Sequence, residues 1–146
     1  MTDHPTPREA FASELGRLSR RWRTVLDERL RHTGLTQARW STLLLLSRAD
    51  ADITQRELAL QAGIEGPTLV RLLDALERQG LIERVPAEGD RRAKHVRLAP
   101  GAHAVLAEIS EIATALRREI LADVAPEDLA TCLRVFRRIG ARLGAC

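Results

Sequence analysis

The chain has 146 residues, of which 45% are hydrophobic and only 3% aromatic, so aliphatic side chains must build the core, which favours helices over a β-sandwich. Its formal charge of +3 and its pI of about 9.6 are compatible with a nucleic-acid partner but do not require one. The longest apolar run, Leu43–Leu46, is too short for a membrane span, and the N-terminus lacks the features of a signal peptide, so we expect a cytoplasmic protein without membrane contact.

The first third of the chain predicts two helices after a short tail. Residues 1–7 contain two prolines and small polar residues, which indicates a frayed end. Apolar residues at helical spacing then predict a helix that begins at Arg8 and ends near Gly34, which suits a left-handed cap. Thr36 is predicted to cap a second, buried helix over residues 37–48.

Two further helices are predicted in the middle of the chain. Thr54 and Glu57 have capping-box spacing, which predicts a helix over residues 55–62 that stops at Gly63. Pro67 suits the first turn of the next helix, because that position has no helical partner for an N–H group. The core stripe of this helix consists of leucines at helical spacing: Leu69, Leu72, Leu73 and Leu76.

A β-hairpin and two outer helices are predicted to complete the chain. Residues 81–85 and 95–98 indicate short strands joined by a long, charged tip over residues 86–94. Two amphipathic helices follow Pro100 and Pro126. Their apolar faces carry Val105, Ile109, Ile112, Leu116, Ile120 and Val124 on the first helix, and Leu129, Leu133, Phe136, Ile139 and Leu143 on the second.

The outer helices are informative because each has a broad apolar stripe. They occupy residues 8–34 and 100–146 and flank a compact centre over residues 35–99. A second copy of the chain would cover these stripes best, so we predict dimerisation helices and a homodimer. Cys132 is expected to fill the core on the apolar side of the last helix. Together with Cys146 it has neither disulfide nor metal-ligand spacing, so no metal site and no cofactor are expected.

The central segment has the order helix, tight turn, helix and charged hairpin. In a helix-turn-helix, the second helix enters the major groove with its N-terminal residues toward the base edges. Here these residues are Gly66, Pro67 and Thr68, followed one turn later by Arg71, and arginine is the commonest reader of guanine. The charged tip adds four candidates: Asp90, Arg91, Arg92 and Lys94. Basic residues on such a tip suit a neighbouring minor groove, and Asp90 suits the orientation of a nearby arginine.

Each of these signals also has an ordinary explanation. Many helical proteins have a glycine between short helices, and a charged hairpin tip is usually only solvated. The two signals together, in this order and with short connections, are more specific. They predict a winged helix-turn-helix that binds DNA.

The same regions resemble the MarR family of bacterial transcription regulators, and within it the SlyA branch. The residues that carry the resemblance lie in Leu15–Leu30, Leu35–Trp40, Ile64–Arg71, Leu76–Ile82, Asp90–Lys94 and Ile120–Ala122. The resemblance implies a mainly α fold with a small β-hairpin wing, in which the N- and C-terminal helices interlock into a dimer. It also implies that the helix from Gly66 reads the major groove, that Arg91 reaches the minor groove, and that a two-fold dimer prefers palindromic operators with half-sites ~10 bp apart.

The resemblance also implies a small-molecule ligand. Family members release DNA when small aromatic carboxylates such as salicylate bind, and the matching positions here are Arg20, Trp40 and Arg71. The chemistry is suitable, because arginine pairs bidentately with a carboxylate and tryptophan offers a ring face. The ordinary alternative is that Trp40 belongs to the core and that Arg20 is solvated or forms a salt bridge.

Two other classes of function compete with a regulator. An enzyme is disfavoured because the sequence has no dinucleotide-binding glycine motif, no P-loop, no nucleophile elbow and no zinc-protease motif. A helical interaction module that has lost its DNA affinity is disfavoured by the intact charged tip. The sequence specifies neither the operator nor the natural ligand, and it does not distinguish a repressor from an activator or an anti-silencer.

Overall fold

The computed structural model describes residues 6–144, except for the side chain of Arg91. Residues 1–5 of the predicted tail and Cys146 lie outside the described residues, whereas Thr6 and Pro7, which were predicted to belong to the tail, cap and begin the first helix. Two compact units make up the chain, and the division falls between Ala113 and Thr114. In the described part of the chain, none of the helices combines the length and the apolar character needed to cross a membrane.

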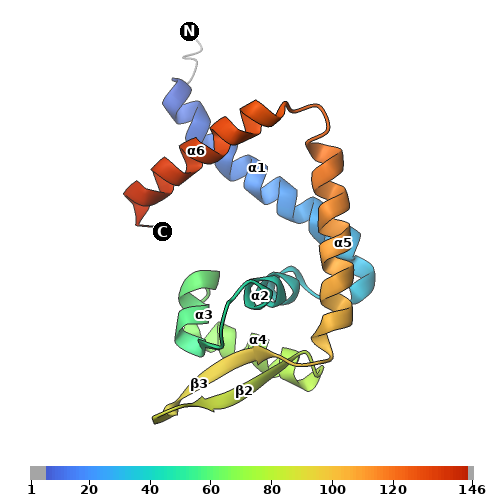
Figure 1. Ribbon diagram of the computed structural model, residues 1–146, viewed down its shortest axis with the longest axis vertical. Helices are drawn as coiled ribbons and strands as arrows, with labels where there is room; N and C mark the ends of the chain where they lie inside the picture. The colour runs from blue at the N-terminus through green and yellow to red at the C-terminus, as the bar shows by residue number, and fades with distance from the viewer. Residues whose placement is uncertain (1–5, 145–146) are drawn as a thin grey trace. The chain divides into compact units, whose positions relative to one another are not determined.

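The first unit begins with two helices whose ends are set by local caps (Figure 1). Helix α1 (Pro7–Leu30) continues into the 3-10 turn η1 (Arg31–Thr33), which ends at Gly34 with a φ of 72°. Helix α2 (Gln37–Ser47) begins after Thr36, whose side chain accepts a hydrogen bond from the backbone N–H of Arg39. The predicted helix end at Gly34 and the predicted cap at Thr36 are therefore confirmed. Both could be predicted from the sequence because capping depends on residues within one turn.

Helices α3 (Gln55–Ala62) and α4 (Gly66–Arg78) form the predicted pair in the middle of the chain. The predicted capping box is present at the start of α3. The Thr54 hydroxyl accepts from the Glu57 N–H at 3.1 Å, and the Thr54 N–H donates to the Glu57 carboxylate at 2.8 Å. In α4, the predicted stripe is confirmed at three leucines that are 0% exposed: Leu69, Leu73 and Leu76.

The hairpin differs from the prediction, because its strands are longer and its tip is shorter. Strands β2 (Ile82–Ala87) and β3 (Asp90–Leu98) leave only Glu88 and Gly89 between them, and Gly89 has a φ of 80°. Much of the charged segment predicted as a loop is therefore strand. The charged side chains did not prevent the two strands from pairing. In a narrow hairpin these side chains can reach solvent while the backbone groups form the hydrogen bonds between the strands.

The sheet has a third strand that the sequence did not indicate. Strand β1 (Ile53–Thr54) has only two residues and pairs antiparallel with β3, which gives the order β1-β3-β2. β2 is therefore an edge strand, and its register with β3 shifts between Pro86 and Ala87. An edge position with a bulge tolerates proline, which cannot donate to a ladder.

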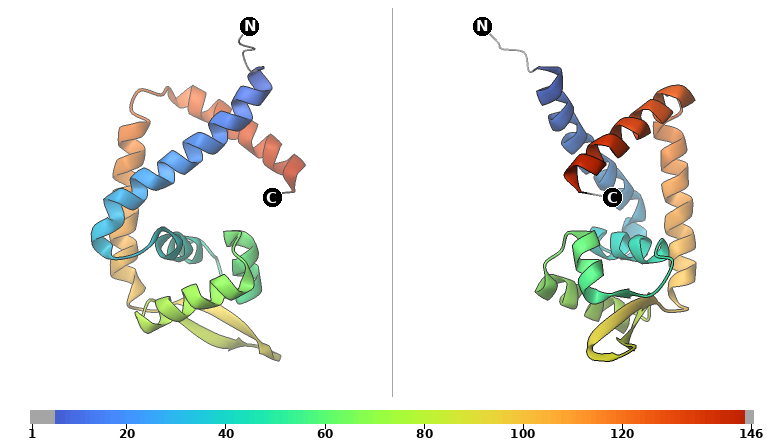
Figure 2. Two further views of the ribbon diagram at one scale, coloured as in Figure 1. Left: turned by 180° about the vertical axis from the view of Figure 1, so that it is seen from behind. Right: turned by 60° about the vertical axis from the view of Figure 1, so that its left-hand side comes forward.

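The core of the first unit lies between its helices and the sheet. Its largest apolar side chains with less than 2% exposure are Leu30, Leu43, Leu58, Leu69, Leu73, Leu76, Ile82, Val96 and Ile109. Figure 2 shows the β2–β3 hairpin extending beyond α2, α3 and α4. Trp40 is 3% exposed, and its indole N–H donates to Asp27 at 2.9 Å, which links α2 to α1.

The second unit contains the end of α5 (Ala102–Ile120) and all of α6 (Pro126–Leu143). Pro126 occupies the first turn of α6, as expected for a residue without an N–H group. Cys132 is exposed in this chain, so the prediction that it fills the core is wrong. The error arises because helical spacing identifies an apolar face but not whether anything covers it.

We expect the substitution Thr54→Val to lower the free energy of unfolding by about 1 kcal/mol, because the cap of α3 loses its acceptor. Urea unfolding followed by circular dichroism measures this loss. The hydrogen bonds from Thr54 hold the pKa of Glu57 below its usual range. A carboxyl group whose pKa is lowered by folding stabilises the fold at a pH above its unfolded-state pKa, and this stabilisation is lost as the pH falls through its folded-state pKa. The effect of Thr54→Val should therefore shrink in acid.

Thr24→Val is the matched control, because the Thr24 hydroxyl is exposed and donates only to the Arg20 carbonyl within α1. Its expected effect is within about 0.5 kcal/mol. Equal losses for the two variants would show that the capping box does not stabilise the unit.

Candidate DNA interface

The first turn of α4 has free backbone donors. Gly66, Pro67 and Thr68 are all exposed in this turn. The preceding residue, Glu65, forms no side-chain cap, and the first turn contains no acidic residue. The helix therefore begins with N–H groups that its own side chains leave unsatisfied, in contrast to the capped start of α3. Such an end of a helix is suited to a phosphate.

Arg71 lies on the exposed side of α4. It follows Pro67 by four residues, so both belong to one face, and it lies two residues from the buried Leu69 and Leu73. The predicted set of Gly66, Pro67, Thr68 and Arg71 is therefore accessible at one end of the same helix. A guanidinium in this position can reach beyond the helix toward a base edge.

A groove of about 750 Å³ separates the helix pair from the hairpin. Gln55, Arg56 and Leu60 line it from α3, Gly66 and Val70 from α4, and Arg84, Arg92 and Lys94 from the hairpin. The lining includes four cationic side chains and no carboxylate. Such a surface has a positive potential and favours a polyanion.

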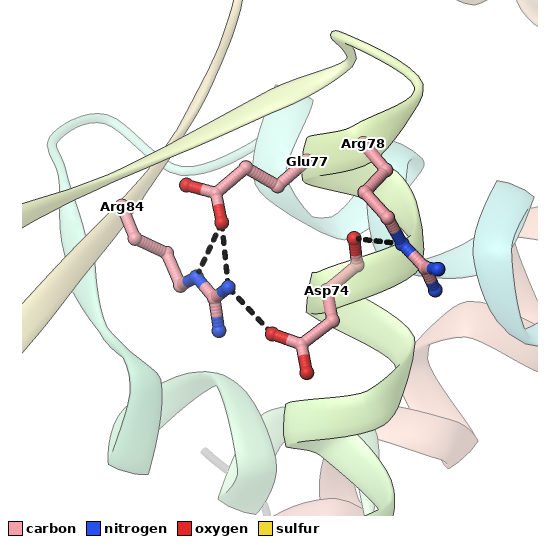
Figure 3. Close-up of polar contacts among 4 residues, drawn as sticks. All are labelled: Asp74, Glu77, Arg78 and Arg84. Carbon is pink, nitrogen blue, oxygen red and sulfur yellow. Dashed lines mark hydrogen bonds and ion pairs between the residues drawn. The ribbon is translucent and has the colours of Figure 1, made fainter.

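Three of these four cations are available to a ligand. Arg56, Arg92 and Lys94 are exposed and form no ion pair with the described residues. Arg84 is different, because it pairs with Asp74 and Glu77 of α4 (Figure 3). Hydrogen bonding to Arg84 holds the pKa of Glu77 below its usual range, and bonding to Glu77 raises the pKa of Arg84.

The start of β3 is ordered by Asp90. Its carboxylate accepts a hydrogen bond from the backbone N–H of Arg92 at 2.8 Å. Asp90 therefore contacts the backbone of an arginine and shapes the exit from the turn. Arg91 lies in β3, and its side chain is outside the described part of the chain.

The predicted ligand residues lie on three different helices, outside the groove. Arg20 is exposed on α1, where its guanidinium lies against Gly16 of the same helix. Trp40 is buried, and Arg71 is exposed on α4. None of the three lines the groove. Because Trp40 is only 3% exposed, neither face of its ring is open to a ligand in this structure.

Sequence reasoning missed Arg56 and the ion pairs of Arg84. Arg56 could have been found, because it lies in the first turn of a helix whose start was predicted. Arg84 could not have been assigned, because its partners lie 10 and 7 residues earlier on another element. Only the packing of β2 against α4 brings these residues together.

Comparisons with known proteins agree on one family. A MarR family model matches residues 33–93. The solved structure of the transcriptional regulator PA3341 is 48% identical, with a TM-score of 0.86 over 93% of this chain and 99% of that chain.

Two other solved structures share the fold. AbsC, a MarR family transcriptional regulator from Streptomyces coelicolor, is 23% identical, with a TM-score of 0.81 over 99% of this chain and 100% of that chain. A cysteine-to-serine variant of MarR from E. coli, complexed with operator DNA, is 24% identical, with a TM-score of 0.77 over 89% and 93%. From the matched family model and the 48% identity across nearly the whole of both chains, this protein belongs to the MarR family of transcription regulators.

Proposed function

We propose that this MarR-family regulator binds a specific duplex operator, with the first turn of α4 in the major groove and the β2–β3 hairpin at the flanking minor groove. One observation carries the proposal, namely the groove in which Arg56, Arg92 and Lys94 stand free of carboxylates. A phosphate backbone that runs between the two DNA grooves is the polyanion that suits this surface. The complex of E. coli MarR with operator DNA supports the proposal, because the two proteins share a fold.

The contacts divide by chemistry. We assign Arg71 to a base edge and Thr68 to a base or a phosphate, since both lie near the free start of α4. Gly66 and Pro67 allow the backbone of α4 to approach the DNA closely. Arg91, Arg92 and Lys94 are assigned to the wing contacts, and Asp90 shapes the wing through its hydrogen bond to the Arg92 backbone.

A homodimer is the second part of the proposal. Apolar side chains remain exposed on the first unit at Phe11, Leu15 and Leu18, which are 42%, 41% and 56% exposed. On the second unit, Leu133, Phe136 and Leu143 are 52%, 43% and 76% exposed. A second copy of the chain would remove these surfaces from water, which supports residues 8–34 and 100–146 as dimerisation segments. Such a dimer would read palindromic half-sites about 10 bp apart.

Release by a small aromatic carboxylate such as salicylate, and membership of the SlyA-like branch, are finer proposals that rest on resemblance. If Trp40 contributes a ring face, the ligand binds a state in which this ring is more exposed than in the present structure. Arg71 would then be shared between ligand and DNA, so that the two compete.

We expect Arg20→Ala to abolish the decrease in operator affinity that salicylate causes, because the carboxylate loses its bidentate partner. Fluorescence anisotropy of labelled operator, titrated with and without salicylate, measures this. Arg21→Ala is the control, because it removes the same charge from the neighbouring exposed position. A salicylate response that survives Arg20→Ala would exclude Arg20 from the ligand site.

The test of DNA binding uses duplexes from the region upstream of the protein's own gene. Anisotropy is read at two salt concentrations against excess random duplex. Binding that resists the competitor and weakens with salt, with a slope of about −0.9 per phosphate contact, is the expected result. No binding at low salt would favour the interaction module, and complete displacement by random duplex would leave only non-specific binding.

A further inference from the structure

Arg84 joins the hairpin to the recognition helix through two carboxylates (Figure 3). Its Nη2 donates to Asp74 Oδ1 at 2.5 Å and to Glu77 Oε2 at 2.5 Å, and its Nε donates to Glu77 Oε2 at 3.1 Å. The Arg84 side chain is 15% exposed, whereas those of Asp74 and Glu77 are 46% and 40% exposed. A planar guanidinium held at two points has little freedom to rotate.

The two carboxylates lie on the side of α4 that faces the wing. Asp74 and Glu77 are three residues apart and so lie one turn from each other. Asp74 continues the row of Gly66 and Val70, two residues that line the groove. Within the described residues, the Arg84 cluster is the only ion-paired link between α4 and the hairpin.

The charges of the cluster are difficult to explain as DNA contacts. Two carboxylates against one guanidinium leave a net negative charge beside a surface proposed for phosphates, and this charge alone would weaken binding. Arg84 lines the groove, but both carboxylates already engage its guanidinium. A role in holding the hairpin accounts for both facts.

We propose that the Asp74–Arg84–Glu77 cluster positions the wing against the recognition helix, so that Arg92 and Lys94 are held across the groove from the first turn of α4. This inference rests on the proposed DNA binding. Arg84 is accordingly a positioning residue and contacts no phosphate. If the hairpin leaves this position, only part of the protein is in the conformation that can bind DNA. The apparent affinity for DNA falls in proportion to that fraction.

The sign of one substitution effect tests the proposal. Asp74→Ala with Glu77→Ala removes two negative charges, which by electrostatics alone would tighten DNA binding. We expect the double variant to bind operator about tenfold more weakly, because the hairpin is released. Unchanged or tighter binding would overturn the proposal. Arg84→Lys, which keeps the charge but loses the planar fork whose Nε and Nη2 both donate to Glu77, should give an intermediate loss.

Arg84→Gln and Arg97→Gln form a matched pair of hairpin variants. Arg97 lies on β3 and contacts Glu83 at 3.0 Å and Asp52 at 3.9 Å, so it pairs with carboxylates without reaching α4. Arg84→Gln should lower operator affinity about tenfold with an unchanged salt slope, and Arg97→Gln should change affinity by less than about threefold. If Arg84→Gln instead reduced the slope of log affinity against log salt concentration by about one, Arg84 would be identified as a phosphate contact.

A DNA-free measurement separates this inference from the proposed function. Hydrogen exchange of the β2 amides should be several-fold faster in the Asp74→Ala, Glu77→Ala double variant, because an edge strand loses its tether to α4. Thermal unfolding confirms that each variant is folded. Exchange at the wild-type rate would overturn the positioning role even if DNA affinity fell. Wild-type protein that binds no duplex would refute the proposed function, while the exchange result would still decide the role of the cluster.

Discussion

Replacing Arg71 by Ala should weaken binding to the specific operator by about 1 to 3 kcal/mol, or about 5- to 150-fold, because a bidentate contact to guanine is lost. Arg71 is exposed near the uncapped start of α4, where a recognition helix meets base edges. Affinity for random duplex should fall much less, so that the ratio of specific to non-specific binding decreases. Competition anisotropy with operator and random duplexes measures both quantities.

Arg78→Ala is the control for this experiment. Arg78 lies on α4 seven residues after Arg71, hence on the same side, but in the last turn, where its Nε donates to the Asp74 carbonyl. The Arg78→Ala substitution removes the same charge as Arg71→Ala, but far from the start of the helix. If Arg71→Ala and Arg78→Ala lowered affinity equally for operator and random DNA, Arg71 would contribute only charge, and the assignment to a base edge would be wrong.

The second large effect concerns the proposed dimer. Leu133→Glu places a carboxylate in the middle of the apolar face of α6, where Leu133 and Phe136 are exposed in the single chain. Burial of two symmetry-related, unpaired carboxylates is costly, so the dimer dissociation constant should rise at least about 100-fold. Sedimentation velocity over a range of concentrations measures this constant. Operator affinity should fall with it, because a monomer occupies only one half-site.

Thr131→Glu introduces the same charge on the opposite, polar side of α6. Thr131 is exposed, and its hydroxyl donates to the Glu127 carbonyl within the helix. This variant should dimerise like the wild type. A Leu133→Glu protein that remains a dimer at the same concentrations would place the interface away from this face of α6.

Local signals in the sequence were sufficient for the helices of the winged unit. The ends at Gly34 and Gly63 and the caps at Thr36 and Thr54 were predicted and are present. Each depends on a left-handed glycine or on a hydroxyl within one turn of the helix, so neighbouring residues decide it. The leucine stripe of α4 was also predictable, because a period of 3.6 residues records which side is buried.

The hairpin was predicted less well, because strand pairing is not a local property. Residues 86–94 indicated a charged loop, yet all of them except Glu88 and Gly89 lie in strands β2 and β3. Strand β1 has two residues and exists only because β3 lies beside it. Cys132 shows the same limit for burial, since its place on an apolar face did not determine whether that face is covered.

The sequence by itself determined the order of the helices and the hairpin, the helix ends at Gly34 and Gly63, the candidate residues on α4 and the resemblance to the MarR family, which the family comparison confirmed. These depend on residue type and on spacing within a few positions, where backbone geometry and capping act. Only the tertiary structure decided that Arg56, Arg92 and Lys94 line one groove and that Arg84 is engaged by Asp74 and Glu77. Contacts between a helix and a strand depend on how the two elements pack, and no spacing along the chain encodes that distance.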